Sequence, residues 1–413
     1  MKMKNTIKSE GMPSLRALYR VGFGPSSSHS IGPQRAAEKF KERCPKAENY
    51  RCVFYGSLAQ TGRGHRSDAA VKRVFAPKNC EVVFDRERKD LPHVNTMTFF
   101  AYEKGREIDR ATALSVGGGS IVFEGEREDE RGVYPESSWQ ALVKSCEAQR
   151  MSLVEYVYFR EGEAIENFLK DIRAAMFAAV KRGLKKEGTL PGGLHLARKA
   201  KKLSSQKGCE LLAYAFAVAE ENAAGNRVVT APTCGSAGVL AAVLCDGEER
   251  GLWAQRETLH ALAVAGLVGN VIKRNGSISG AECGCMAEIG SACAMAAAAS
   301  AFLAGGDPQV IECAAEIALE HHLGLTCDPV GGLVQIPCIE RNAVAAAASK
   351  SAAALALAVA PWKKISLDRV IGVMKATGHD LKAGYRETAA AGLAAFQDVA
   401  QHPLHGILRQ GSG

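Results

Sequence analysis

The chain has 413 residues, a formal net charge of +8 at pH 7, and 47% hydrophobic residues. This length exceeds what one compact core usually supports, so we expect two or three domains. Aromatic residues make up only 6%, while alanine and glycine are abundant. That bias argues against a β-sandwich and favours helices packed through small residues.

The basic residues do not form the stripe with interleaved aromatics that is typical of nucleic-acid-binding proteins. The longest basic clusters, residues 181–186 and 198–202, are interpreted as solvated helix faces. We therefore expect no nucleic-acid partner. The modest positive potential would attract an anionic or zwitterionic amino acid.

The sequence also indicates where the protein resides. Met1–Glu10 is polar and lysine-rich, and no apolar segment follows it, which predicts no signal peptide. The alanine-rich run Ala343–Ala360 is interrupted by polar residues, and it predicts a buried helix rather than a membrane span. We expect a cytoplasmic protein without a membrane partner.

The first part of the chain, residues 1–125, alternates short strand and helix patterns, which predicts a small α/β domain. The predicted elements are strands at Arg51–Tyr55, Glu81–Phe84 and Met97–Tyr102, helices at Arg35–Glu42 and Asp68–Val74, and a strand and turn at Leu114–Phe123.

A charged stretch with glycine and proline, residues 126–138, predicts a linker. Residues 139–413 are expected to form a larger, all-helical domain, so the predicted fold class is α+β. The predicted helices are Ile165–Arg182, Glu210–Ala223, Gly238–Leu244, Glu257–Val271, Cys285–Leu303 and Pro308–His322.

A loop of glycines and serines at residues 21–33 runs into a predicted helix, with Pro33 suited to the first helical turn. Serine hydroxyls and free N–H groups at a helix start can bind a carboxylate or a phosphate. An ordinary capped helix start explains the same pattern, and spacing alone leaves both interpretations open.

Two histidines stand in polar or glycine-rich surroundings. His65 follows several glycines at residues 55–68, and its near-neutral pKa suits a general base. His93 lies at residues 91–97. A surface histidine is the alternative interpretation for each.

Thirteen cysteines are many for a cytosolic protein, and their odd number argues against a disulfide framework. Cys285, Cys327 and Cys338 each have glycine or proline close by. They form neither a zinc-finger pair nor a compact ferredoxin run. Either they are buried thiols, or they assemble a metal site from separated segments.

Taken together, these segments resemble the iron–sulfur L-serine dehydratases over nearly the whole chain. The matching segments are Gly24–His29 (GPSSSH), Gly62–Asp68, Ser115–Gly119 (SVGGG), Leu190–Leu194 (LPGGL), Ala231–Leu240, Ser277–Glu288, Glu320–Asn342 and Ala376–Thr388. The resemblance implies an enzyme that converts L-serine to pyruvate and ammonia, and a fused two-part chain.

Carried over by position, the resemblance implies site residues. It places the three ligands of a 4Fe-4S cluster at Cys285, Cys327 and Cys338, the Cα base at His65, and a substrate-binding histidine at His93. The substrate-carboxylate loop would comprise Ser26, Ser27, Ser28 and His29, and further substrate candidates are Thr233, Gly235, Ser277 and Ser279. A homodimer is also implied.

The sequence departs from the family pattern at several positions. Cys234 stands where asparagine is common, and Cys283 stands where an aliphatic residue is usual, so Cys283 is interpreted as a neighbour of the ligands. The tail at residues 402–413 has no cysteine that could cap the open iron.

Two other functions remain open from the sequence. One is a related β-eliminating lyase that acts on L-threonine or L-cysteine. The other is a non-catalytic amino-acid sensor, against which the three cysteines and two histidines argue. No lysine stands in a convincing Schiff-base context, which argues against a pyridoxal-phosphate enzyme.

Overall fold

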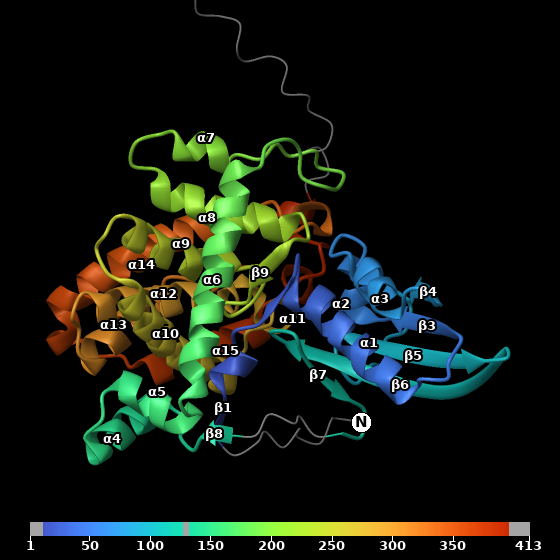
Figure 1. Cartoon of the computed structure of the whole chain (residues 1–413), viewed down its shortest axis with the longest axis horizontal. Coiled ribbons are helices and arrows are strands. Elements are labelled where there is room, and N and C mark those ends of the chain that lie inside the picture. Colours follow the sequence, from blue (N-terminus) through green and yellow to red (C-terminus); the bar gives the residue numbers. More distant parts are fainter. Residues whose placement is uncertain (1–10, 127–131, 396–413) are drawn as a thin grey trace, which may run out of the picture.

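The computed structural model describes residues 11–126 and 132–395, and it shows a small sheet-containing part beside a larger helical part (Figure 1). This is the predicted α+β class. The N-terminal residues 1–10, residues 127–131 of the expected linker and the cysteine-free tail lie outside the described residues.

A five-stranded sheet forms the small part, with strand order β4-β3-β5-β6-β7. Strands β3 and β4 run parallel, and the other neighbours are antiparallel. The strands are β3 (Asn49–Phe54), β4 (Asn79–Phe84), β5 (Thr96–Glu103), β6 (Arg106–Gly117) and β7 (Ser120–Phe123). The three predicted strands and the strand-and-turn are thus confirmed. Gly117, Gly118 and Gly119 make the turn with positive φ angles that glycine adopts readily.

Helices α1 (Gly32–Arg43) and α3 (Ser67–Phe75) cover one face of this sheet (Figure 1), and both were predicted. Phe40 of α1 stacks on Phe99 of β5 with ring centroids 5.4 Å apart, and Tyr50 of β3 stacks on Phe75 of α3 at 4.0 Å. These buried rings remove large apolar areas from water, so the small part has a core of its own.

The N-terminal segment, by contrast, packs into the helical part. Strand β1 (Met12–Pro13) pairs with β8 (Gly132–Tyr134), and β2 (Val21–Phe23) pairs with β9 (Arg227–Val229). Leu15 and Tyr19 are buried in the core of the helices, and the Tyr19 hydroxyl donates to the main-chain oxygen of Leu262 at 2.8 Å. The sequence analysis did not predict these strands, because two or three residues carry no periodicity.

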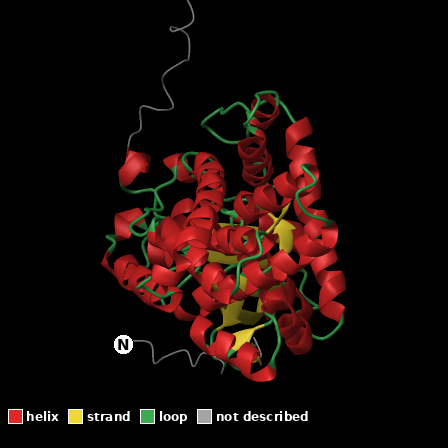
Figure 2. Ribbon diagram, turned by 90° about the vertical axis from the view of Figure 1, so that its left-hand side faces the viewer, coloured by secondary structure: helices red, strands yellow, loops and turns green. Residues whose placement is uncertain are grey.

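The helical part is built around α12 (Ile289–Leu303), whose alanines are buried on all sides against α10, α13 and α14. Figure 2 shows helices filling this side of the molecule, with strands visible only between them. The other helices are α4 (Trp139–Gln149), α5 (Leu153–Glu161), α6 (Ala164–Lys185), α7 (Ala200–Ser204), α8 (Glu210–Ala223), α9 (Ala237–Glu249), α10 (Gln255–Asn275), α11 (Gly280–Cys283), α13 (Pro308–Glu320), α14 (Cys338–Val359) and α15 (Leu367–Asp380), with a short α2 (Gly56–Thr61) in the small part.

Two expectations about these helices need correction. The helix predicted from Cys285 begins at Ile289, because Gly284 at φ +67° ends α11 and a 3-10 turn, Gly284–Met286, follows. Helix α14 is only partly buried, and Val344 is 66% exposed. With the turn that follows it, this helix forms the segment Cys338–Trp362, which is long and apolar enough to cross a membrane. The core helix of a soluble protein can have the same length and composition, and 44% of the most apolar stretch of this segment is buried.

Candidate active site

A cavity lies where the sheet part meets the helical part, and six of the predicted site residues line it. These are Ser26, His65, Gly235, Cys285, Cys327 and Cys338. The remaining walls are apolar side chains and two carboxyls, Glu288 and Glu387. Residues far apart in the sequence, from the first serine loop to Glu387, therefore meet at one place.

The three cysteines reach the cavity from three different segments of the helical part. Cys285 lies in the 3-10 turn before α12, Cys327 lies in the connection between α13 and α14, and Cys338 is the first residue of α14. The Sγ atoms of Cys285 and Cys327 and a carboxylate oxygen of Glu288 all lie within 4.8 Å of one another. A hydrogen bond with Cys285 and burial raise the pKa of the Cys327 thiol, and burial raises that of Cys338.

Arg341 supplies a fixed positive charge beside these thiols, and the sequence analysis missed it. Its Nη1 donates to the main-chain oxygen of Thr326 at 2.6 Å, and its Nη2 lies 3.4 Å from Asp328 Oδ1. Burial opposes its charge, but Cys285, Cys338 and Asp328 raise the pKa of the guanidinium. A fixed cation favours ionised thiols next to it.

The two other cysteines near this set are held apart from the cavity lining. Cys283 packs so closely against Gly378 of α15 that a Cβ added to Gly378 would lie 2.5 Å from Cys283 Sγ. Cys234 is 1% exposed at the start of the turn before α9, and burial raises its pKa. Neither lines the cavity, in keeping with the interpretation of Cys283 as a neighbour.

The serine loop runs directly into α1, as the sequence predicted. Ser26 caps the turn by accepting from the main-chain N–H of His29 at 3.1 Å, a short π-helix spans Ser27–Ile31, and Pro33 stands in the first turn of α1. Ser28 is buried, and the Ser27 hydroxyl is buried without a hydrogen-bond partner among the described residues. The loop therefore places polar groups beside the cavity.

His65 lies in the turn between α2 and α3 and is 1% exposed. Its main-chain oxygen accepts from the Ser30 hydroxyl at 2.8 Å, while its Nδ1 has no partner among the described residues. Burial and the neighbouring His29 lower the pKa of His65 well below its ordinary value, so the ring is neutral at pH 7. Its neighbour Gly64 has to be glycine, because a Cβ there would come within 2.6 Å of Gly332 O.

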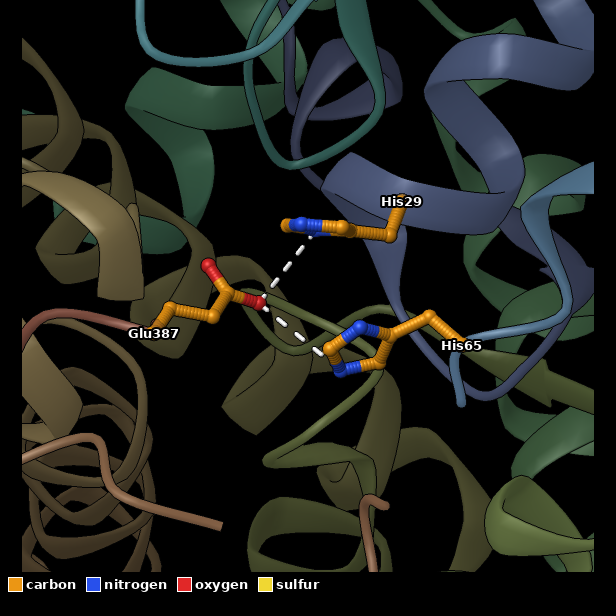
Figure 3. Close-up of side chains that lie close together, drawn as sticks. All are labelled: His29, His65 and Glu387. Atoms are coloured by element: carbon orange, nitrogen blue, oxygen red, sulfur yellow. Dashed lines mark ion pairs between the residues drawn. The ribbon is translucent and has the colours of Figure 1, made fainter. Parts of the chain in front are cut away.

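Glu387 faces both buried histidines (Figure 3). Its Oε1 lies 3.3 Å from His29 Nδ1 and 4.0 Å from His65 Nε2, and the two imidazole centroids are 4.5 Å apart. Burial lowers the pKa of His29 to about 4 and raises that of Glu387 to about 8. The sequence analysis did not assign Glu387, although it is the last residue but one of a quoted motif, Ala376–Thr388.

Glu288 is the second carboxyl of the cavity that the sequence analysis missed. It follows Cys285 by three residues within an apolar run, a context that could have indicated a buried acid. Burial and the neighbouring Glu387 raise its pKa to about 8, and the Thr233 hydroxyl hydrogen-bonds to it. The Thr233 hydroxyl also lies 3.1 Å from that of Ser236. Thr233 therefore reaches the site through Glu288.

Seven predicted residues do not line the cavity. Ser27, Ser28, His29 and Thr233 are described above, and the other three are His93, Ser277 and Ser279. His93 Nε2 lies 3.4 Å from Glu282 Oε1 in a separate surface hollow that also contains Arg86 and Arg386. The Ser277 hydroxyl donates to Glu282 Oε2 at 2.6 Å, and the Ser279 hydroxyl is buried without a partner among the described residues.

The chain is similar to known proteins over most of its length. The family model of the serine dehydratase beta chain matches residues 14–76, and that of the alpha chain matches residues 81–394. The chain is 40% identical to an L-serine dehydratase of Streptomyces coelicolor, over 91% of this chain and 97% of the relative. It is 37% identical to an L-serine dehydratase of Haemophilus influenzae and 38% identical to L-serine dehydratase 1 of Escherichia coli, each over 93% of this chain and 99% of the relative.

Proposed function

The chain belongs to the serine dehydratase family, with the beta and alpha segments fused in one polypeptide, and from this premise we propose that it converts L-serine to pyruvate and ammonia with a 4Fe-4S cluster. The observation that carries the proposal is the meeting of three thiols and the imidazole of His65 at one cavity. Relatives named L-serine dehydratase support the lyase activity.

The donor set fits an iron–sulfur cluster. Cys285, Cys327 and Cys338 would hold it, since thiolates suit such clusters and nitrogen or oxygen ligands suit other metals. Burial keeps the thiols of Cys327 and Cys338 protonated when no metal is bound, and metal binding would release those protons beside Arg341. When bound, a cluster with three protein ligands supplies a Lewis acid that weakens the bond between Cβ and the serine hydroxyl.

The chain's own residues would then bind the substrate and move its proton. The serine loop would bind the substrate carboxylate, and neutral His65 would take the Cα proton. Loss of that proton and of the Cβ hydroxyl leaves aminoacrylate and water. Aminoacrylate tautomerises to an imine, which water hydrolyses to pyruvate and ammonia. Apolar walls from Ile289 and Val334 would limit access of bulk water.

The test is an anaerobic assay of pyruvate formed from L-serine after reconstitution with iron and sulfide. We expect pyruvate from the reconstituted protein and none from the air-oxidised, cluster-free protein. Full activity without a cluster would refute the mechanism. A cluster-loaded protein that ignores serine but acts on L-threonine or L-cysteine would favour a related β-eliminating lyase. One that binds amino acids without turnover would favour a sensor.

Three organisational features belong to the same proposal. We expect a cytoplasmic homodimer. Light scattering of the reconstituted protein would measure its mass and so test whether two chains associate. The proposed domains are residues 1–125 and 139–413, joined by the charged linker 126–138. Strands β1 and β2 of the first domain reach out of it, and they pair with β8 of the linker and β9 of the second domain. Limited proteolysis should then cut first within residues 126–138, and a first cut elsewhere would contradict this division.

A further inference from the structure

The carboxyl of Glu387 has no task in the proposed function, although it is buried beside two histidines. Its Oε1 atom lies 3.3 Å from His29 Nδ1 and 4.0 Å from His65 Nε2 (Figure 3). Glu387 is only 5% exposed, and the two histidines are buried more deeply. Burying a carboxyl costs free energy unless its oxygens find partners. The burial of Glu387 beside the two histidines therefore requires an explanation.

Hydrogen bonds around Ser57 define where His29 carries its proton. The Ser57 hydroxyl donates to the main-chain oxygen of Glu387 at 2.9 Å. That bond uses the single proton of the Ser57 hydroxyl. Ser57 Oγ must therefore be the acceptor in its other contact, which is with His29 Nε2 at 3.1 Å. His29 Nε2 thus holds a proton, and a neutral ring presents a bare Nδ1. His29 Nδ1 lies 3.3 Å from Glu387 Oε1 and 3.4 Å from the Ser26 hydroxyl. The shorter contact, with the carboxyl, then holds one shared proton, whichever atom carries it.

That shared proton leaves Oε1 with a lone pair for His65. The 4.0 Å separation from His65 Nε2 exceeds a hydrogen bond, but such contacts commonly shorten when substrate fills a site. An N–H on Nε2 that points at Oε1 puts the lone pair of His65 on Nδ1. His65 Nδ1 is the nitrogen that has no partner among the described residues.

The main chain of Glu387 is fixed from both sides of the cavity. Its N–H donates to the main-chain oxygen of Cys327 at 2.8 Å, and the Cys327 N–H donates to Tyr385 O at 2.8 Å. From the sheet part, Ser57 bonds the Glu387 oxygen. The main chain of Glu387 is thus set jointly by a cysteine of the helical part and a helix of the sheet part, and the Ala281 N–H bonds the carboxyl itself.

We infer that Glu387 is a positioning residue, which with His29 fixes the tautomer and orientation of His65 so that His65 Nδ1 can accept the substrate Cα proton. The inference rests on the proposed function, because it takes His65 as the base. It follows the common arrangement in which a third group orients a catalytic base.

The experiment uses the cluster-loaded full chain with Glu387→Gln and, as the matched control, Thr388→Ala. Thr388 holds the same turn through Ala383 O and Gly384 O, but it does not contact the histidines. In the glutamine variant no single atom can share a proton with His29 and also accept from His65. We expect kcat to fall by about 10²-fold, with KM nearly unchanged and a larger isotope effect with α-deuterated serine. Thr388→Ala should keep all three values.

A second readout does not depend on activity. In protein labelled with ¹⁵N-histidine, ring-nitrogen spectra report the tautomer of each histidine, and His65→Asn identifies the His65 signals. We expect His65 to carry its proton on Nε2 in the wild type, and to lose that preference in Glu387→Gln only. An unchanged His65 tautomer in Glu387→Gln would overturn the inference, whether or not kcat falls or the cluster is lost. If the wild type forms no pyruvate, the proposed function fails, whereas the ring spectra still decide the role of Glu387.

Discussion

The two walls of the cavity are built on different principles. The cysteine wall stands at the ends of long alanine-rich helices, where α12 is buried on all sides and each cysteine lies at a turn or a helix start. The histidine wall stands on short turns of a small sheet domain with a separate aromatic core. The difference teaches that packed helices hold the three cysteines, while a network of hydrogen bonds and short turns holds the two histidines and Glu387.

Cysteine substitution on the helical wall should have the largest effect. We expect Cys327→Ala to abolish both cluster absorbance and pyruvate formation, because one of three thiol ligands is lost. Cys313→Ala is the matched control, since Cys313 is equally buried but lies on α13, away from the cavity lining. A cluster retained in Cys327→Ala would remove Cys327 from the ligand set.

The histidine wall should separate chemistry from cluster binding. We expect His65→Ala to lower kcat by about 10²–10⁴-fold, the usual contribution of a general base, while the cluster absorbance per chain stays at the wild-type level. Comparison of absorbance and turnover in one preparation checks this. Equal loss of both would mean that His65 supports the fold rather than the proton transfer.

The pH dependence tests the same wall without a mutation. Burial and His29 lower the pKa of His65, so its neutral, basic form persists as pH falls below 6.5. Among the described residues, His29, with a pKa of about 4, and Glu387, with a pKa of about 8, lie beside His65. Glu288, with a pKa of about 8, and the three cysteines line the same cavity. We expect kcat/KM to hold at pH 6.5 and to fall only at lower pH. An acidic limb centred at or above pH 6.5 would contradict this.

A substitution that adds a methyl group within the cysteine wall tests whether that wall is rigid. A Cβ at Gly280 would come within 2.7 Å of Glu288 Oε2 and 3.2 Å of Cys327 Sγ. We expect Gly280→Ala to lower the free energy of unfolding by about 1–3 kcal/mol, measured by denaturant titration, and to weaken cluster retention. Gly372→Ala on α15 is the control, because nothing lies within 4 Å of its added Cβ. An equal free energy of unfolding for the two variants would show that the cysteine wall can move to accommodate the added methyl group.

The sequence predicted these two walls to different degrees. Periodicity identified the strands and most helices, and the motif resemblance identified the three cysteines, His65 and Ser26 that line the cavity. Glu288 and Glu387 were missed, because neither acid belongs to a periodic pattern, although the apolar run around Glu288 offered a signal. Strands β1, β2, β8 and β9 were missed for a related reason, since their pairing depends on partners distant in the chain.

The pairing between Cys327 and the segment that ends at Glu387 has a consequence for biosynthesis. A ribosome completes all three cysteines before it reaches Glu387. At that moment Cys327 still lacks the main-chain partners that Tyr385 and Glu387 provide, and the two histidines still lack their carboxyl. The same late-made segment therefore completes both walls of the cavity, and a chain interrupted before Glu387 would leave the cysteine wall and the histidine wall unfinished together.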